Sequence, residues 1–412
     1  MIYIIGSGFS GLTTAYALLK KNKDITIIAP TKIVQKNKNF AIFKYILNKH
    51  GEIKNSPKEI VDTINFIEKI SYDNCKYISS HYDGGLSNVW GGVLSDIKNY
   101  NLEKFPFSNN TINNLDKKFR VLEKVIFNKN FNMSNTKNNS KEDITWIKLN
   151  QNKTNTTNLK KYLINKGVKF RYGLYLKKIL FKNKNMLLYD LKKKKDFTLQ
   201  YKKIYLSAGP FNTAKIILNS FEEYKMIKLY ETRHFYCLIK KKDTYEDQYF
   251  KFNYNNVKFY CQLYSFNKIF NIFFKKKFKN LNLFNGYYVG QCYLNVKNSG
   301  YIKVKKDKNN KFLIKGFNDN FIKSKIKSTF KKYNNKNSNI KFYFPILNTP
   351  GASNHIGSSF PMSKKITKWN TRLNGQLSKY KDIHLSDSSV LNQIDMQPIT
   401  LFTIFNILRM NN

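Results

Sequence analysis

The first residues whose spacing suits a chemical role are three glycines near the amino terminus, Gly6, Gly8 and Gly11. In this G-x-G-x-x-G pattern the first glycine permits a tight turn and the second lets a diphosphate approach the backbone. The third lets a helix pack closely on a strand. The N–H groups and positive end of that helix would then bind phosphate. The pattern predicts a dinucleotide site, against the alternative of a glycine turn in some other α/β protein.

The segments around these glycines have the order that such a site needs. Residues Ile2 to Ile5 predict a buried strand, and Leu12 to Leu19 predict a helix. Residues Ile25 to Ile28 predict the second parallel strand. An acidic residue at the end of that strand usually binds the adenosine ribose, but Ala29 and Pro30 stand there. The ribose would therefore be held by other groups or bound less tightly.

Small residues recur in a second glycine-rich loop and in a later turn. The loop contains Gly84, Gly85, Ser87 and Trp90. Glycines beside a tryptophan indicate either a backbone pressed against a flat ligand or a simple surface turn. The later turn ends a predicted strand that begins at Ile204, and it consists of Ala208, Gly209 and Pro210.

These segments, in this order, resemble the glucose-methanol-choline family of FAD-dependent oxidoreductases. The resemblance covers about the first 20 residues, the loop 83–92, residues 105–108, 167–176 and 206–209, and most of the chain from His355 onward. The run Ser-Asn-Val-Trp at 87–90 is most similar to the smaller bacterial branch that oxidises sugars. Val89 stands where some relatives carry a histidine linked to the flavin, so the resemblance implies non-covalent FAD.

The resemblance also implies roles for individual residues. Those expected to contact the cofactor are Gly6, Gly8, Gly11, Gly84, Gly85, Ser87, Trp90, Leu176, Ala208, Gly209, Asp387 and Pro398. Asp387 follows the last predicted strand and would approach the ribityl or phosphate part, although aspartate also favours turns for local reasons. Pro398 opens the last predicted helix, whose positive end would face the flavin.

His355 and Gln397 match the two catalytic positions of the family. A neutral histidine can accept the proton of an alcohol, because its pKa lies near working pH; the alternative is a structural histidine. The family has His or Asn at the second position, and Gln397 keeps an amide donor but shifts it by about 1.5 Å, one C–C step. The implied reaction is oxidation of an alcohol, of a sugar or glycosyl derivative.

The fold class expected is α/β, with a doubly wound, Rossmann-like FAD-binding domain and an inserted, mainly antiparallel-sheet substrate domain. The FAD-binding domain would combine residues 1–110, 155–220 and 345–412, with 111–154 as a connecting segment. Alternating aromatic and polar residues predict the antiparallel strands within 221–345. Isoleucines at three- and four-residue spacing predict a helix between His50 and about Lys76.

Composition narrows the remaining possibilities. The formal net charge of +47 would favour a nucleic acid or an anionic membrane surface as partner. The enrichment of Lys, Asn, Ile, Phe and Tyr is typical of an AT-rich coding sequence, so no specific nucleic acid is expected. The four cysteines form no close pair, so neither zinc, another metal site, nor a disulfide framework is predicted. No apolar run reaches membrane-spanning length, and a cytoplasmic location is expected.

Two alternatives to the oxidoreductase stay open. Ala29 and Gln397 both depart from the family pattern, which fits a flavin-binding protein of this fold with lost or altered redox activity. The charge of +47 leaves a basic protein that binds nucleic acid or anionic surfaces. Nothing in the sequence identifies an electron acceptor.

Overall fold

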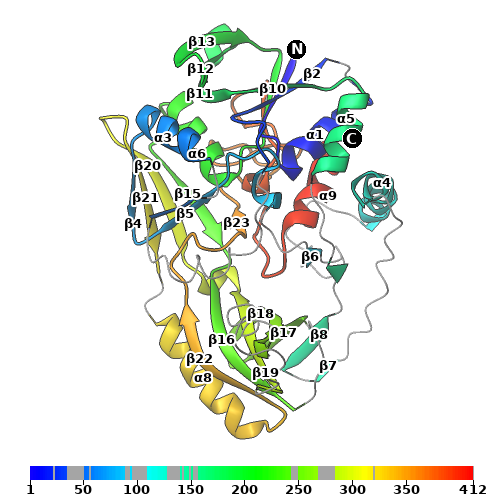
Figure 1. Cartoon of the computed structure of the whole chain (residues 1–412), viewed down its shortest axis with the longest axis vertical. Coiled ribbons are helices and arrows are strands. Elements are labelled where there is room, and N and C mark those ends of the chain that lie inside the picture. Colours follow the sequence, from blue (N-terminus) through cyan, green and yellow to red (C-terminus); the bar gives the residue numbers. More distant parts are fainter. Residues whose placement is uncertain are drawn as a thin grey trace, which may run out of the picture.

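The computed structural model arranges the chain as two bodies along its long axis, and both ends of the chain lie in the upper body of Figure 1. The residues that the structure describes are 1–21, 24–34, 51–54, 57–88, 93–94, 109–127, 140–141, 143–147, 150–151, 156–242, 249–267, 284–318 and 321–411. Trp90, Val89, His50 and the expected step at 105–108 lie outside these residues.

A five-stranded parallel sheet forms the centre of the upper body. Its strands are β1 (Ile2–Ile5), β2 (Ile25–Ala29), β10 (Lys169–Tyr172), β14 (Lys203–Leu206) and β24 (Ile383–Leu385). Their order in space is β10-β2-β1-β14-β24, and every neighbouring pair is parallel. Numbered along the chain, this is the doubly wound order 3-2-1-4-5, which changes direction between β1 and β14. Ligands of open α/β sheets bind beyond the carboxyl ends of the strands at such a point.

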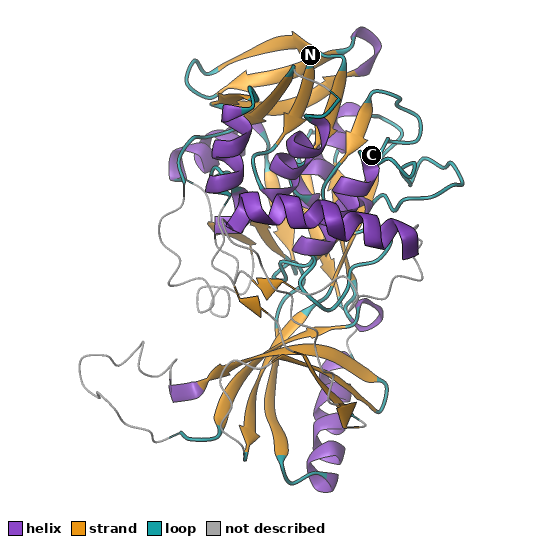
Figure 2. Cartoon of the chain, turned by 90° about the vertical axis from the view of Figure 1, so that its right-hand side faces the viewer, coloured by secondary structure: helices purple, strands orange, loops and turns teal. Residues whose placement is uncertain are grey.

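Both faces of this sheet are covered, which explains why β1 and β2 consist almost wholly of buried apolar residues. One face packs against apolar side chains of four helices. These helices are α1 (Phe9–Leu18), α4 (Asn109–Phe127), α5 (Thr157–Asn165) and α9 (Thr400–Met410). In Figure 2 helices stand in front of the sheet on this side. The other face packs against α6 (Pro210–Ser220) and the sheets beyond it.

Two further sheets, of three and five strands, lie against α6. One is antiparallel, with β11 (Leu174–Leu180), β12 (Asn185–Asp190) and β13 (Lys195–Gln200). The other has the order β23 (Ile356–Gly357), β15 (Met226–Glu231), β20 (Tyr301–Lys306), β21 (Phe312–Phe317) and β4 (Ile70–Asp73). The remaining elements of this region are α3 (Lys58–Ile67), β3 (Gly51–Lys54) paired with β5 (Lys76–Ser79), and β6 (Val93–Leu94) paired with β9 (Asn150–Gln151).

The lower body is a seven-stranded antiparallel sheet with one helix on it (Figures 1 and 2). Its order is β22 (Ile340–Leu347), β16 (His234–Lys241), β19 (Tyr287–Leu294), β18 (Val257–Ser265), β17 (Tyr249–Tyr254), β8 (Ile144–Ile147) and β7 (Ser140–Lys141). One face packs phenylalanines against α8 (Ile322–Lys336). Because side chains alternate along a strand, the other face carries His234, Tyr260 and Tyr293.

The expected α/β class is confirmed at the level of a parallel five-stranded sheet with separate antiparallel sheets. The segment 221–345 supplies strands to both a mixed sheet and the lower sheet, and β7 and β8 from 111–154 join the lower sheet. The prediction of a helix between His50 and about Lys76 is wrong in its length. Of the described residues in this range, only Lys58–Ile67 are helical, because Ile70–Asp73 pairs with β21 and Lys76–Ser79 with β3. Among the described helices, none is long and apolar enough to cross a membrane.

Candidate functional site

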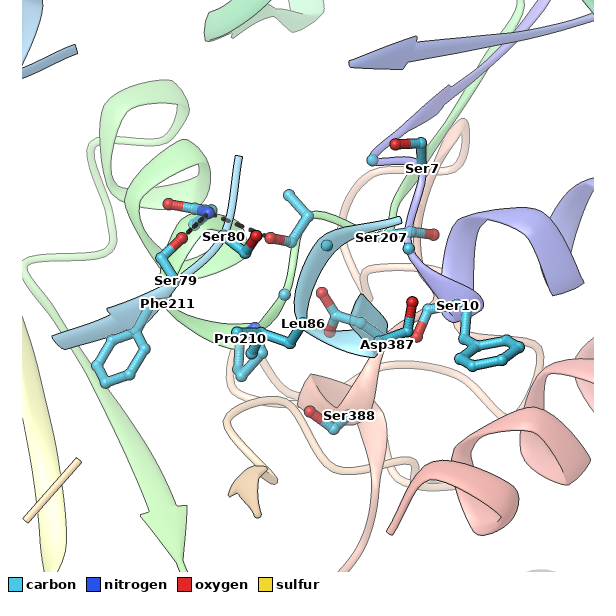
Figure 3. Close-up of a pocket in the computed structure, with 18 of the residues that line it drawn as sticks. Ser7, Ser10, Ser79, Ser80, Leu86, Ser207, Pro210, Phe211, Asp387 and Ser388 are labelled. Atoms are coloured by element: carbon cyan, nitrogen blue, oxygen red, sulfur yellow. Dashed lines mark hydrogen bonds between the residues drawn. The ribbon is translucent and has the colours of Figure 1, made fainter. Parts of the chain in front are cut away.

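A cleft opens beyond the carboxyl ends of β1 and β14, at the point where the sheet order changes direction. It encloses about 1570 Å³, including the part open to solvent. We call it the switch-point cleft. The predicted cofactor residues that line it are Gly6, Gly8, Gly84, Gly85, Ser87, Leu176, Ala208, Gly209 and Asp387. Figure 3 shows Ser7, Ser207 and Asp387 arranged around this cleft.

Two of the three glycines in the first turn, Gly6 and Gly11, leave no room for a side chain. Gly6 has a φ of +112°, and a Cβ there would overlap the carbonyl oxygen of Ser207 at the end of β14. Gly11 does not line the cleft, and a Cβ on it would overlap the carbonyl oxygen of Gly6. Helix α1 therefore begins directly against the turn, with Gly8 as its N-cap. The positive end of α1 faces the cleft without an acidic residue in its first turn, which favours an anion.

The second glycine loop packs on the first. The N–H of Gly84 donates to Ser7 Oγ at 3.3 Å, and Ser87 Oγ donates to the Gly84 carbonyl at 2.5 Å. Residues Gly85–Asn88 form a single 3₁₀ turn, η1. A Cβ on Gly84 would collide with side chains of Thr156 and Asn88. Two loops that are far apart in sequence thus form one cradle with exposed backbone.

Asp83 anchors the second loop to the helical face of the upper body. Its carboxylate forms an ion pair with Lys160 of α5 and accepts a hydrogen bond from Tyr172 Oη at 3.2 Å. Its carbonyl accepts a hydrogen bond from Asn88 Nδ2 at 2.6 Å. Asp83 is buried, so these bonds hold the loop in position.

The turn after β14 forms the opposite wall. Gly209 has a φ of +82°, and Pro210 is the first residue of α6. Asn212, which the sequence did not single out, lines the cleft and donates to Ser79 Oγ at 2.9 Å. Its Oδ1 accepts a hydrogen bond from Tyr77 Oη at 2.7 Å. These bonds connect the turn to β5.

Asp387 lies between the end of β24 and the start of α6. Its Oδ2 accepts a hydrogen bond from Thr213 Oγ1 at 2.6 Å, and its Oδ1 accepts one from the Ser389 N–H at 2.9 Å. Burial raises its pKa, and these hydrogen bonds act in the opposite direction. The carboxyl group therefore both lines the cleft and joins two elements of the upper body.

The expected catalytic residues border the cleft rather than line it. Asn354 and Ile356 line it, whereas the side chain of His355 stacks on Tyr293 with ring centroids 4.4 Å apart. Burial lowers the pKa of His355 to about 3, and a hydrogen bond with the backbone of Met396 acts in the opposite direction. Its Nδ1 has no hydrogen-bond partner. His355 is therefore a neutral, buried imidazole.

Gln397 and Pro398 lie in the segment that leads to α9. Gln397 is fully buried, and its N–H donates to Asp395 Oδ1 at 3.0 Å. Neither residue lines the cleft, but the next two, Ile399 and Thr400, do. Through Met396 this segment contacts His355, so the two expected catalytic positions are neighbours.

The structure adds residues to this region that sequence reasoning missed. His234 lies at the start of β16 with its ring centroid 5.7 Å from that of Tyr293, and both of its ring nitrogens lack a partner. Burial, followed by the charge of Lys76, lowers its pKa to about 3. Tyr260 is opposite Tyr293 in the sheet, and its hydroxyl also lacks a partner. We call His234, Tyr260, Tyr293 and His355 the histidine–tyrosine cluster.

A buried ionic network lies behind the part of the cleft wall that Tyr175 forms. Lys215 Nζ lies 2.8 Å from Glu68 Oε2, which also accepts a hydrogen bond from Tyr175 Oη at 2.9 Å. Tyr175 and His81 line the cleft. Burial and the charge of Lys215 lower the pKa of His81 to about 3, so it is neutral at physiological pH. At the end of β2, Ala29 is buried and Pro30 lines the cleft.

The sequence matches no family model and no curated protein. Among the described residues, no group of three or more His, Cys, Asp or Glu side chains is placed to hold a metal ion. Function must therefore be argued from the cleft and the residues around it.

Proposed function

We propose that this chain is an FAD-dependent oxidoreductase of the glucose-methanol-choline type, which oxidises an alcohol group of a sugar or glycosyl derivative. The observation that carries the proposal is the position of the glycine cradle. It lies at the change of direction in a 3-2-1-4-5 parallel sheet, where a dinucleotide would bind. The choice of a sugar rests on the resemblance of residues 87–90.

The residues of the cleft fit the diphosphate of such a cofactor. Gly8, Phe9 and Ser10 at the α1 N-terminus line the cleft, so backbone N–H groups of this turn are available to a diphosphate. Gly6 and Gly11 instead allow the close backbone packing that holds the turn in place. Gly84, Gly85 and Ser87 would cover the cofactor from the second loop, and Leu176, Ala208 and Gly209 would contact it from the other wall. Val89 implies that the cofactor is held without a covalent bond.

The histidine–tyrosine cluster fits the proton-transfer part of the reaction. Bound FAD would supply the acceptor for the hydride. The imidazole of His355 is neutral and its Nδ1 has no partner, so it can accept a hydrogen bond from a substrate hydroxyl. Its pKa of about 3 lies below the pKa near working pH that the sequence predicted, which makes His355 a weaker proton acceptor than expected. Gln397 would orient the substrate oxygen through its amide. Tyr260 and His234 offer further groups that a polar substrate could satisfy.

A second candidate is a flavin-binding protein of this fold without alcohol oxidation. It is favoured by one observation: His355 and Gln397 border the cleft but do not line it. The absence of an acidic residue at Ala29 points the same way, because it removes a ribose contact.

The deciding experiment is an absorption spectrum of the purified protein with added FAD, followed by anaerobic titration with a panel of sugars. The proposal expects a bound flavin that one of these sugars bleaches. His355→Asn should slow the bleaching at least tenfold. His384→Asn is the matched control, because His384 is also buried but stacks on Tyr205 away from the cleft.

Three outcomes would change the conclusion. Failure to bind FAD would overturn both candidates. Binding without reduction by any sugar in the panel would favour the second candidate. Equal rates for the parent and His355→Asn would mean that another group accepts the proton.

A further inference from the structure

A second cavity lies outside the switch-point cleft. It encloses about 1260 Å³, including open solvent, and shares no lining residue with the cleft. The two are separated by a thin wall. Ser358 lines the second cavity, and its N–H donates at 2.9 Å to the carbonyl of Ser388, which lines the cleft. A ligand in the second cavity would therefore be distinct from one in the cleft.

Two exposed aromatic side chains border this cavity. Tyr230 at the end of β15 is 37% exposed, and Trp369 is 42% exposed. Trp369 is held in place because its ring packs edge-on against Tyr224, with centroids 5.5 Å apart. Lys368 Nζ lies over the Trp369 ring, 5.1 Å from its centroid, so at most one face of this ring is open to a ligand. An aromatic face at the edge of a cavity can stack on a ligand ring.

Two polar side chains of the cavity wall have unmet hydrogen bonds. Ser359 is nine-tenths buried, and its Oγ has no partner. Asn392 donates from Nδ2 to the Met362 carbonyl at 2.9 Å, but its Oδ1 has no partner. Gln393 adds a second amide. Buried polar atoms without partners are costly, so a ligand with hydroxyl groups would be stabilised here.

One positive charge faces the cavity. Lys228 is the only charged side chain among the described residues that line it. In the sheet, Lys228 is directly opposite Lys303, and Lys303 is directly opposite Lys315. Lys315 is paired with Asp73 at 2.6 Å, whereas no described carboxylate lies within ion-pair distance of Lys228 or Lys303. Like charges that face each other across strands are destabilising, and an anion would relieve this repulsion.

We propose that this cavity is a second ligand site for a sugar-like ring that carries a phosphate or similar anionic group. The ring would stack between Tyr230 and Trp369, and its hydroxyls would bond to Ser359, Asn392 and Gln393. The anionic group would contact Lys228. This inference does not rest on the oxidoreductase proposal, because no residue of the switch-point cleft takes part.

The same sheet face is less suited to stacking nucleic-acid bases. Tyr301 and Phe317 continue the row from Tyr230, but their rings stack on each other with centroids 4.8 Å apart. Lys303 covers the Phe317 ring at 4.4 Å. Single-stranded nucleic acids need a series of free ring faces, and the stacked, lysine-covered rings of this row do not offer one.

The test is calorimetric titration of the full chain, saturated with FAD where it binds, with glucose 1-phosphate as the probe. Glucose and inorganic phosphate are titrated separately. The proposal expects the sugar phosphate to bind at least tenfold more tightly than either part. Lys228→Gln and Trp369→Ala should each weaken binding about tenfold, a loss of about 1.4 kcal/mol. Trp369→Phe, which keeps a flat ring, should retain most of the affinity.

Lys305→Gln is the matched control, because Lys305 lies on the same sheet but outside the cavity lining. It should bind like the parent. Equal affinity for inorganic phosphate and glucose 1-phosphate would overturn the ring contact. Binding that survives both Lys228→Gln and Trp369→Ala would overturn the location. If a short single-stranded RNA binds tightly and displaces the probe, the ligand of this cavity is a nucleic acid and not a sugar phosphate.

Discussion

The switch-point cleft and the histidine–tyrosine cluster are neighbours that differ in whether their polar groups have hydrogen-bond partners within the protein. In the cleft, Ser7, Ser87 and Asp387 bond to backbone or side chains of the protein itself. In the cluster, His234, Tyr260 and His355 keep buried atoms without partners. A region that satisfies its own polar groups is a rigid frame, whereas one that does not is prepared for another molecule. The frame would hold a cofactor, and the cluster would do chemistry on a substrate.

The largest effect should come from the buried ionic network behind the cleft wall. Lys215→Met leaves the Glu68 carboxylate buried without its cation, so the free energy of unfolding should fall by about 3–5 kcal/mol. Chemical denaturation measures this. Lys215→Met with Glu68→Leu should recover most of the loss, because no charge then stays buried. A single variant as stable as the parent would show that Lys215 and Glu68 do not form a buried ion pair.

A smaller loss is expected at the first glycine turn. Gly6→Ala combines an unfavourable positive φ with overlap of the Ser207 carbonyl, so it should destabilise by more than about 2 kcal/mol and abolish FAD binding. Gly167→Ala is the control, since Gly167 also has a positive φ but no atom lies within 4 Å of the place that an added methyl group would take. The control should lose only about 1–2 kcal/mol. Thermal unfolding with and without FAD separates the two effects.

The buried histidines of the cluster should make the free energy of unfolding depend on pH. Burial lowers the pKa of His234 and His355 to about 3, whereas an unfolded histidine titrates near 6.5. The unfolded chain therefore binds more protons as pH falls from 6.5 toward 3, and stability is lost in that window. Between pH 7.5 and 5.0 each histidine should cost up to about 2 kcal/mol.

The variant that checks this is His234→Phe, which should lose less stability on acidification than the parent. Denaturant unfolding at the two pH values gives the difference. An unchanged pH dependence would mean that His234 is already charged or exposed in the folded protein.

The smallest effect is expected from Asp387→Asn. Burial raises the pKa of its carboxyl, which means that its charge opposes folding at neutral pH. Asp387→Asn removes the charge and keeps an acceptor for the Ser389 N–H, so the unfolding free energy should change by only about 1 kcal/mol. Asp387→Ala loses both hydrogen bonds and should cost about 2–3 kcal/mol. If both variants lower the free energy of unfolding equally, then packing of the side chain, and not its hydrogen bonds, supplies the stability at this position.

The frame could be predicted from the sequence because its signals are local. The strand at Ile2–Ile5, the strand near Ile25 and the glycine turn between them lie within 30 residues and have their own patterns. The cluster could not be predicted in full. The contact between His234 and Tyr293 depends on the register of β16 with β19, and no short sequence pattern specifies that register.

The positions of the cysteines also depend on strand register and could not be predicted from their spacing in the sequence. They are widely separated in sequence, yet Cys261 and Cys292 are directly opposite in neighbouring strands, with their Sγ atoms 3.2 Å apart. Cys237 lies 3.7 Å from Cys292. All three are free thiols in the apolar layer under α8, where burial raises the pKa of Cys261 and Cys292.

The strand order of the parallel sheet has a consequence for how the protein is made. Two neighbouring strand pairs of the sheet are far apart along the chain: β14 follows β1 by roughly 200 residues, and β24 follows β14 by roughly 180. At about 5–20 residues per second, an apolar edge of the growing sheet stays unpaired for roughly 10–40 s at each of these steps. During synthesis, a chaperone would be expected to bind this unpaired apolar edge.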